Sequence, residues 1–251
     1  MLAEGTPMDR REERYGISLW GEFTDKSLEG EFLAESLGSA KRNTAYIALV
    51  FGVVLGLFLV NSILAEWGTE LLAGVAAVRL IFIIVSAIVY FAVRRITKHQ
   101  HLVYLITFYQ AMMALTYLLT LKYYESLDYF SILALMVITL AMYLLPNRIV
   151  FSQIVSVVFA ILFFMYPIHK INSLQIHEFH RIIAYQAILL IYCNINYCWA
   201  KAYKRKTFKA NRELLEMSTK DPLTGVYNRK NFDDAVDHWI RFDPQLWRIS
   251  A

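Results

Sequence analysis

Cysteine and charged residues are both scarce in this chain. Two cysteines occur among 251 residues, and Asp, Glu, Lys and Arg together make up 18% of the sequence, whereas 57% is hydrophobic. Cys193 and Cys198 are spaced so that they face different directions on a helix, which argues against a disulfide or a shared metal ion and favours a packing role. Because a soluble domain carries about a quarter charged residues, the composition is that of a membrane protein.

The short motifs of several enzyme classes are also missing. The sequence contains no glycine-rich phosphate-binding loop, no Cys/His pattern with finger spacing and no nucleophilic-serine elbow. No stretch combines basic and aromatic residues in the manner of nucleic-acid-binding segments, so no nucleic-acid partner is expected. The formal net charge of +4 is better explained by basic residues lying beside anionic lipid.

Apolar runs long enough to cross a bilayer recur along the chain. Six spans are predicted, at about 44–64, 71–93, 102–121, 129–145, 149–168 and 181–199. The first run begins too far from Met1, and is followed by too many others, to be a cleaved signal peptide. The predicted fold class is an all-α polytopic membrane bundle of six transmembrane helices, with the lipid bilayer as its first partner.

Basic residues are distributed unevenly between the loops. Those that follow the second and sixth predicted spans are Arg94, Arg95, Lys98, Lys201, Lys204, Arg205, Lys206, Lys209 and Arg212. The loops on the opposite side contain few. Since basic loops stay in the cytoplasm, and six is an even number, both termini are expected there.

Arg79 is a basic residue near the middle of the second predicted span. No Asp or Glu lies within any predicted span, so its expected partners are backbone carbonyls, Glu66, Gln110, Gln153, Gln186 and Asn194. An intramembrane cation is a functional candidate by default. Two interpretations stay open: an arginine that extends outward and anchors the bundle, or a site within the bundle that responds to a ligand or signal.

His177 and His180 lie in the predicted fifth loop, three positions apart. They share a face if that segment is helical, so metal binding or proton sensing is a weak candidate role. The alternative, which we favour, is that they are polar residues of an interfacial loop.

Residues 1–43 form a polar, amphipathic segment before the first span. A short cytoplasmic helix is predicted from about Ser27 to Ser39, with Ser27 as its cap. The segment Phe23-Thr24-Asp25-Lys26-Ser27-Leu28-Glu29 followed by six spans resembles, in its layout, the membrane anchors of some bacterial nucleotide cyclases, both adenylate and diguanylate.

A second motif lies near the C-terminus. Pro222 is expected to end the preceding helix, Gly225 to permit a tight turn, and Asn228 to cap a helix over about 229–241. The run from Asp221 to Phe232 resembles the opening of a GGDEF domain, the catalytic module of diguanylate cyclases. The positions that match the family pattern are Asp221, Leu223, Thr224, Gly225, Asn228, Arg229 and Phe232, with Val226 and Lys230 as conservative departures.

The resemblance implies an α/β domain of which this chain holds the first helix and the start of the first strand, at 246–251. An intact relative uses Mg²⁺ to join two GTP molecules into cyclic di-GMP. The family's metal-binding and guanine-reading residues have no counterpart in this sequence. The chain is therefore expected to have no catalytic residues, no cofactor of its own and no activity, and to be a truncated member whose matched residues are structural.

The segment between the last span and this motif has coiled-coil spacing. Its apolar and small residues are four, three, four and three apart, which is typical of a dimer seam: Tyr203, Thr207, Ala210, Leu214 and Met217. One continuous helix is predicted to leave the membrane and to form a homodimer. The alternative is a basic helix lying near the lipid headgroups.

The predicted organisation has four parts: a cytoplasmic segment at 1–43, a transmembrane sensor at 44–199, a signalling helix at 200–219 and the GGDEF fragment at 220–251. The favoured function is the sensor and anchor of a diguanylate cyclase in a bacterial inner membrane. The alternative is an inactive interaction protein that dimerises with intact GGDEF proteins and modulates them. A transporter is disfavoured, because the spans lack paired acidic groups and broken helices in matching halves.

Overall fold

The computed structural model describes residues 15–18, 20–65, 67–124, 129–165 and 176–219. Within these ranges the fold is all-helical, as the composition predicted, apart from an isolated bridge between Ile17 and Phe23. The helices are α2 (Lys26–Ala65), α3 (Glu70–Arg95), α4 (His99–Tyr123), α5 (Tyr129–Leu144), α6 (Ile149–Met165) and α7 (Ile176–Thr219).

Four of these helices, α2, α3, α4 and α7, are long and apolar enough to cross a membrane, and α5 and α6 are shorter apolar helices. Their outward faces carry large exposed hydrophobic side chains, among them Leu57, Ile88, Phe91 and Ile161. A water-soluble monomer would not expose so much apolar surface, whereas lipid accommodates it. The structure therefore supports a membrane protein.

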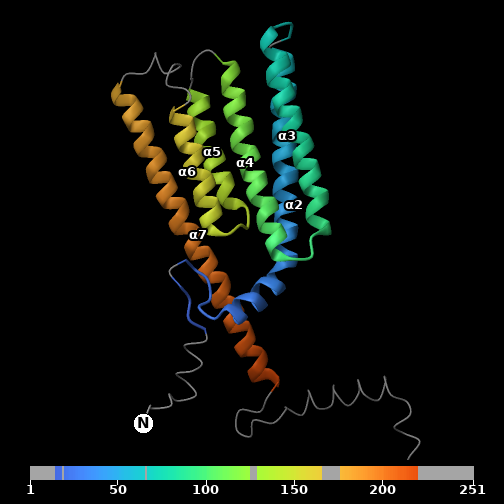
Figure 1. Ribbon diagram of the computed structural model, residues 1–251, viewed down its shortest axis with the longest axis vertical. Coiled ribbons are helices and arrows are strands. Elements are labelled where there is room, and N and C mark those ends of the chain that lie inside the picture. Colours follow the sequence, from blue (N-terminus) through green and yellow to red (C-terminus); the bar gives the residue numbers. More distant parts are fainter. Residues whose placement is uncertain (1–14, 19, 66, 125–128, 166–175, 220–251) are drawn as a thin grey trace, which may run out of the picture.

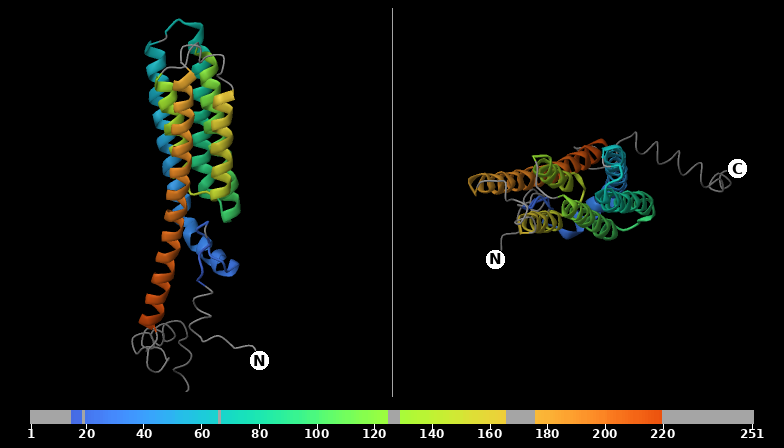
Figure 2. Two further views of the ribbon diagram at one scale, coloured as in Figure 1. Left: turned by 90° about the vertical axis from the view of Figure 1, so that its left-hand side faces the viewer. Right: turned by 90° about the horizontal axis from the view of Figure 1, so that it is seen from above.

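The helices form an elongated bundle, with α2 and α3 at one edge and α7 at the other (Figures 1 and 2). Helix α4 contacts α2, α3, α5 and α6, and α7 contacts α5 and α6. At the lower end in Figure 1, α3 ends, α4 and α6 begin and the segment before α2 meets α7. Arg94 and Arg148 lie at these helix ends, Lys41 bonds to the Ile96 carbonyl, and Lys201 lines one cavity with Arg148, so we call this end the basic end.

Small residues bring α2 and α3 close together. Ala48 is fully buried, and a Cβ atom added at Gly52 would lie 3.2 Å from the Ser86 Cβ. The Ser86 and Tyr109 hydroxyls are hydrogen-bonded at 2.9 Å, which joins α3 to α4. In lipid there is little hydrophobic force between helices, so close packing of small residues and such hydrogen bonds hold these helices together.

Larger side chains fill the space between α4, α5, α6 and α7. Leu135, Met142, Phe159 and Phe163 are almost completely buried there, and Cys193 packs among them. Both cysteines are free, with Cys193 buried and Cys198 half-buried. The packing role predicted for Cys193 is therefore confirmed.

The prediction of a separate helix over about 27–39 with Ser27 as its cap is wrong. The helix begins at Lys26, and the Asp25 Oδ1 accepts a hydrogen bond from the Ser27 amide at 2.8 Å, so Asp25 is the cap. Helix α2 then continues without a break through the polar residues around 41–43. The Lys41 Nζ donates to the carbonyl of Ile96 at 2.6 Å, which satisfies the end of α3.

The first turns of α2 bend away from the axis of its longer part (Figure 1). The region contains the pair Gly38–Ser39, and the Ser39 hydroxyl donates to the Ser36 carbonyl at 2.9 Å. Gly/Ser pairs and hydroxyls that bond to carbonyls within a helix are common causes of such bends. The bend carries the start of α2 towards α7.

Candidate functional site

The segment before α2 and the first turns of α2 are bound to α7 by a buried ion pair. The Arg205 Nε donates to the Glu29 Oε2 at 2.8 Å, and the Arg205 Nη2 donates to Glu29 Oε1. Only 3% of the Arg205 side chain is exposed. Two parallel bonds of this kind fix the guanidinium plane as well as its position.

Three phenylalanines surround this ion pair. Phe32 and Phe208 meet edge to face with ring centroids 5.4 Å apart, and Phe23 lies 6.1 Å from Phe208. The Arg205 guanidinium carbon lies 4.6 Å from the centre of the Phe32 ring. We call Phe23, Glu29, Phe32, Arg205 and Phe208 the clasp. Its residues come from two segments about 175 positions apart in sequence, so it joins the start of α2 to the middle of α7.

A tight turn before α2 makes the clasp possible. Gly21 has a φ of +71°, and a Cβ atom added to it would lie 2.8 Å from the Cys198 carbonyl oxygen on α7. Only glycine adopts this conformation freely and also allows this approach. The Phe23 amide then donates to Glu29 Oε2 at 3.0 Å, which orients the carboxylate towards Arg205.

Glu29 precedes the apolar part of α2, and its pKa reflects the clasp. Burial acts to raise the pKa of Glu29, but the hydrogen bonds from Arg205 and the Phe23 amide, with the positive charges of Arg205 and Lys201, outweigh it and hold the pKa below its ordinary value of 4.5. Glu29 is therefore ionised at neutral pH.

A second ion pair lies further along α7. Arg212 Nη1 donates to Glu31 Oε2, and both side chains are more than two-fifths exposed. Exposed pairs contribute about 0–1 kcal/mol, so the clasp rather than this pair accounts for the attachment.

A buried polar network lies just inside the bundle from the clasp. Gln110 is fully buried; its Nε2 donates to the Met142 carbonyl at 2.6 Å and to the Ser152 hydroxyl at 3.0 Å, and its Oε1 accepts from the Asn147 Nδ2 at 2.8 Å. The Tyr197 hydroxyl accepts from the Asn147 amide at 2.8 Å. The network connects α4, the α5–α6 turn and α7, so it fixes α7 where it leaves the bundle.

Arg79 is half-buried between α2 and α3 in the other half of the bundle. Its Nη1 donates to the Phe58 carbonyl at 2.7 Å and to the Ser62 hydroxyl, and its Nη2 lies 3.4 Å from the Tyr124 hydroxyl. The expectation of a backbone carbonyl partner is confirmed. Among the residues with described positions, every oxygen that accepts from Arg79 is uncharged.

The three glutamines expected to pair with Arg79 do not contact it. Gln110 belongs to the network above, and the Gln186 Nε2 donates to the Thr139 hydroxyl at 2.8 Å. Gln153 is half-buried on α6, and its carbonyl accepts from Ser156 at 3.1 Å. That prediction is therefore wrong, because the glutamines lie on other helices than the α2–α3 pair that holds Arg79.

The remaining candidate residues from the sequence are two histidines and the GGDEF-like motif. His177 and His180 both lie in the first turns of α7, and His180 is exposed. Across the described ranges, no three His, Cys, Asp or Glu side chains form a group able to hold a metal ion. The motif residues Asp221, Leu223, Thr224, Gly225, Asn228, Arg229 and Phe232 lie outside the described residues.

The predicted helix that leaves the bundle is confirmed, because α7 is continuous from Ile176 to Thr219. The five seam residues all lie exposed on one face: Tyr203, Thr207, Ala210, Leu214 and Met217. Arg205, Phe208 and Arg212 project about 180° away, since each residue of a helix turns the direction by about 100°. The clasp therefore occupies the opposite face and leaves the seam uncovered.

The clasp was not identified from the sequence, although its signal was present. The segment from Phe23 to Glu29 was noted for its resemblance to cyclase anchors, and the structure gives three of its residues a role: Phe23 and Glu29 in the clasp and Asp25 as the cap of α2. Its partner, Arg205, was one of six basic residues after the last span, and nothing in the sequence distinguished it from the others.

Comparisons with protein-family models and with curated protein sequences found no match to this chain.

Proposed function

We propose that this protein is the membrane sensor and anchor of a GGDEF diguanylate cyclase, and that α7 is its output helix. One observation carries the proposal: a single helix runs from the bundle to Thr219, two residues before the GGDEF-like motif at Asp221, clasped on one face and uncovered on the other. GTP and Mg²⁺ belong to the catalytic domain of an intact relative.

In this proposal all six helices cross a bacterial inner membrane and the basic end lies in the cytoplasm. At 1.5 Å per residue, α5 and α6 are about 24–26 Å long, a little short of the ~30 Å hydrocarbon core. They lie beside α4 and α7 within the bundle (Figures 1 and 2). Reporter fusions after Arg95 and after Arg212 should both report cytoplasm; an external signal from either contradicts the six-span topology.

The seam supports a parallel homodimer. Its five residues are uncovered, and two GGDEF domains must face each other to join their GTP molecules. Cysteine at Leu214 or Met217 should therefore crosslink between chains readily, whereas cysteine at Arg212, on the clasp face, should not. Equal crosslinking at all three positions would favour the surface-helix alternative.

The signalling role is tested by grafting. Residues 1–219 would be fused in register to the complete GGDEF domain of an active cyclase, and cyclic di-GMP would be measured for the wild-type anchor and for Glu29→Gln. We expect a severalfold change in output at equal expression, because the clasp restrains α7. The control is Glu31→Gln, which removes only the exposed pair. Equal output from all three proteins would mean that the bundle does not signal through α7.

The interaction-protein alternative is tested by co-expressing the chain with an intact membrane cyclase. A change in cyclic di-GMP that disappears with Leu214→Glu would favour modulation through the seam. This outcome requires no activity in the chain itself.

A further inference from the structure

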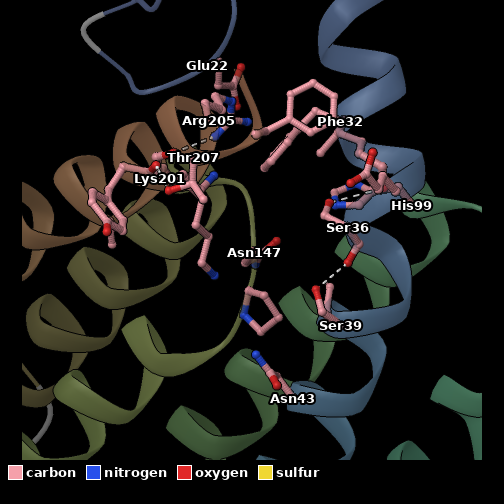
Figure 3. A pocket seen from close by; sticks show the side chains of 18 of the residues that line it. Glu22, Phe32, Ser36, Ser39, Asn43, His99, Asn147, Lys201, Arg205 and Thr207 are labelled. Carbon is pink, nitrogen blue, oxygen red and sulfur yellow. Dashed lines mark hydrogen bonds between the residues drawn. The ribbon is translucent and has the colours of Figure 1, made fainter. Parts of the chain in front are cut away.

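A cavity of about 680 Å³ lies at the basic end, between the first turns of α2 and the part of α7 that carries the clasp. The turn between α5 and α6, with Asn147 and Arg148, closes it towards the bundle, and His99 adds the start of α4. Figure 3 shows Lys201 and His99 entering from opposite sides of the space. Small-molecule sites in proteins typically have this size.

Charged groups line the cavity from every side. They are the acids Glu22, Glu29 and Glu35 and the basic residues His99, Arg148, Lys201, Lys204 and Arg205. Glu29 and Arg205 neutralise each other in the clasp. Arg148, Lys201 and Lys204 then face the two carboxylates of Glu22 and Glu35, and these basic residues lie on the α5–α6 turn and α7.

Lys201 differs from the other basic residues on this part of α7. It is half-buried, whereas Lys204 and Lys206 are exposed. Within the described residues, no carboxylate lies within ion-pair distance of its ammonium group, and its recorded side-chain contact is with the face of the Tyr197 ring, 5.1 Å from the ring centre. An ammonium group held in this way favours an anionic partner.

The electrostatic surroundings of Lys201 also favour binding of an anion. Lys201 follows the apolar stretch of α7, and burial lowers its pKa to about 8. Burial also lowers the pKa of His99, which precedes the apolar part of α4, and the charges of Arg148 and Lys201 lower it further. In addition, α4 begins at His99 and α6 directly after Arg148, so the positive ends of two helix dipoles lie at the cavity wall.

We propose that this cavity binds a phosphate-bearing anion, with Lys201 and Arg148 as its charged ligands and His99 as a polar one. The phosphate comes either from the headgroup of an anionic lipid or from a soluble metabolite. Because Glu29, Phe32, Arg205 and Phe208 form one wall, an occupant contacts the clasp directly. An effect of the occupant on signalling through α7 rests on the proposed function, whereas the binding site itself does not.

The test follows the acylation of Lys201 by acetic anhydride, read by mass spectrometry, in the purified full chain. A bound phosphate covers the amine and favours its protonated form, and a rise of one pKa unit lowers the reactive fraction about tenfold. Lys26, exposed and outside the cavity, is the internal control. The chain is placed in bilayer discs of phosphatidylcholine, with or without inorganic phosphate, and in discs containing phosphatidylglycerol.

Slower acylation of Lys201 but not Lys26 with inorganic phosphate identifies a soluble ligand; slower acylation only with phosphatidylglycerol identifies a headgroup. Arg148→Gln should weaken either effect about tenfold, the usual consequence of losing one charge-assisted hydrogen bond. Arg148 is exposed, so folding should not depend on it. Lys201 acylation that is equal in all discs, or protection unchanged by Arg148→Gln, would overturn the proposal. Neither measurement involves cyclic di-GMP, so the experiment tests the proposed binding site independently of the proposed signalling function.

Discussion

Two arginines, Arg205 and Arg79, lie in very different environments in this molecule. At the basic end, Arg205 is buried against a carboxylate and the rings of Phe23 and Phe32. In the other half of the bundle, Arg79 is half-buried and donates to a helix carbonyl and a serine hydroxyl. A paired, buried charge holds distant segments in one arrangement, whereas a cation bound by neutral oxygens of adjacent helices is easily replaced.

The largest expected effect is that of Arg205→Met, which keeps the length of the side chain and removes its charge. Removing one partner of a buried ion pair costs about 3–5 kcal/mol, because the other charge stays buried without compensation. We expect the segment before α2 to separate from α7 while the bundle stays folded. Hydrogen exchange of the amides between residues 20 and 32 should become much faster.

Arg205→Lys is the matched control, since it keeps the charge but loses the two-bond geometry. Its exchange rate should lie between those of the wild-type chain and Arg205→Met. Unchanged exchange in Arg205→Met would show that the aromatic rings alone hold the clasp.

Acid is expected to open the clasp with a smaller effect, because a protonated Glu29 still accepts a hydrogen bond. The pKa of Glu29 is held below 4.5, so its contribution is complete above that pH and is lost as the pH falls through the lower folded value. Exchange of the same amides, corrected for its intrinsic pH dependence, should stay constant from neutral pH to about pH 5 and then rise. In Glu29→Gln that transition should be absent; its persistence would assign it to another group.

Arg79→Met is expected to cost about 1 kcal/mol, because it removes hydrogen bonds to acceptors that remain partly satisfied within α2. The variant should insert into the membrane normally and unfold at a slightly lower temperature in a thermal assay of purified protein. A loss larger than that of Arg205→Met would reverse the comparison and make the α2–α3 site the main ionic contact of the bundle.

The smallest effect is expected for Glu31→Gln. Its ion pair with Arg212 is more than two-fifths exposed, and such pairs contribute about 0–1 kcal/mol. Hydrogen exchange and thermal unfolding should match those of the wild-type chain, and they should stay matched as salt is raised. A clear loss would show that this pair acts together with the clasp.

Much of the architecture was predictable because hydropathy and helical spacing act over short distances. The membrane composition, the apolar helices and the continuity of α7 follow from neighbouring residues. The break expected near 40–43 was wrong, since Lys41 and its neighbours change polarity without disfavouring helix, and Lys41 finds its partners on α3. A change in composition is therefore not in itself a helix end.

The clasp and the partners of Arg79 were not predictable for a different reason. Glu29 and Arg205 are about 175 positions apart in sequence, and their meeting depends on how six helices pack. The glutamines were predicted as partners of Arg79 only because they are polar residues within apolar stretches of sequence. Which polar groups meet inside a bundle is decided by helix neighbours, and a single sequence does not fix those.

Because α7 is unbroken, the direction in which its far end points depends on the number of residues it contains. From Arg205 to Thr219 the helix rises about 21 Å, and each inserted residue would turn everything beyond it by about 100°. One extra residue after Arg212 would thus redirect the far end while leaving the clasp intact, whereas seven would restore its direction to within about 20°. The number of residues in this stretch therefore sets the angle at which its far end points. Under the proposed function, we expect insertions of seven residues there to be tolerated far better than insertions of one.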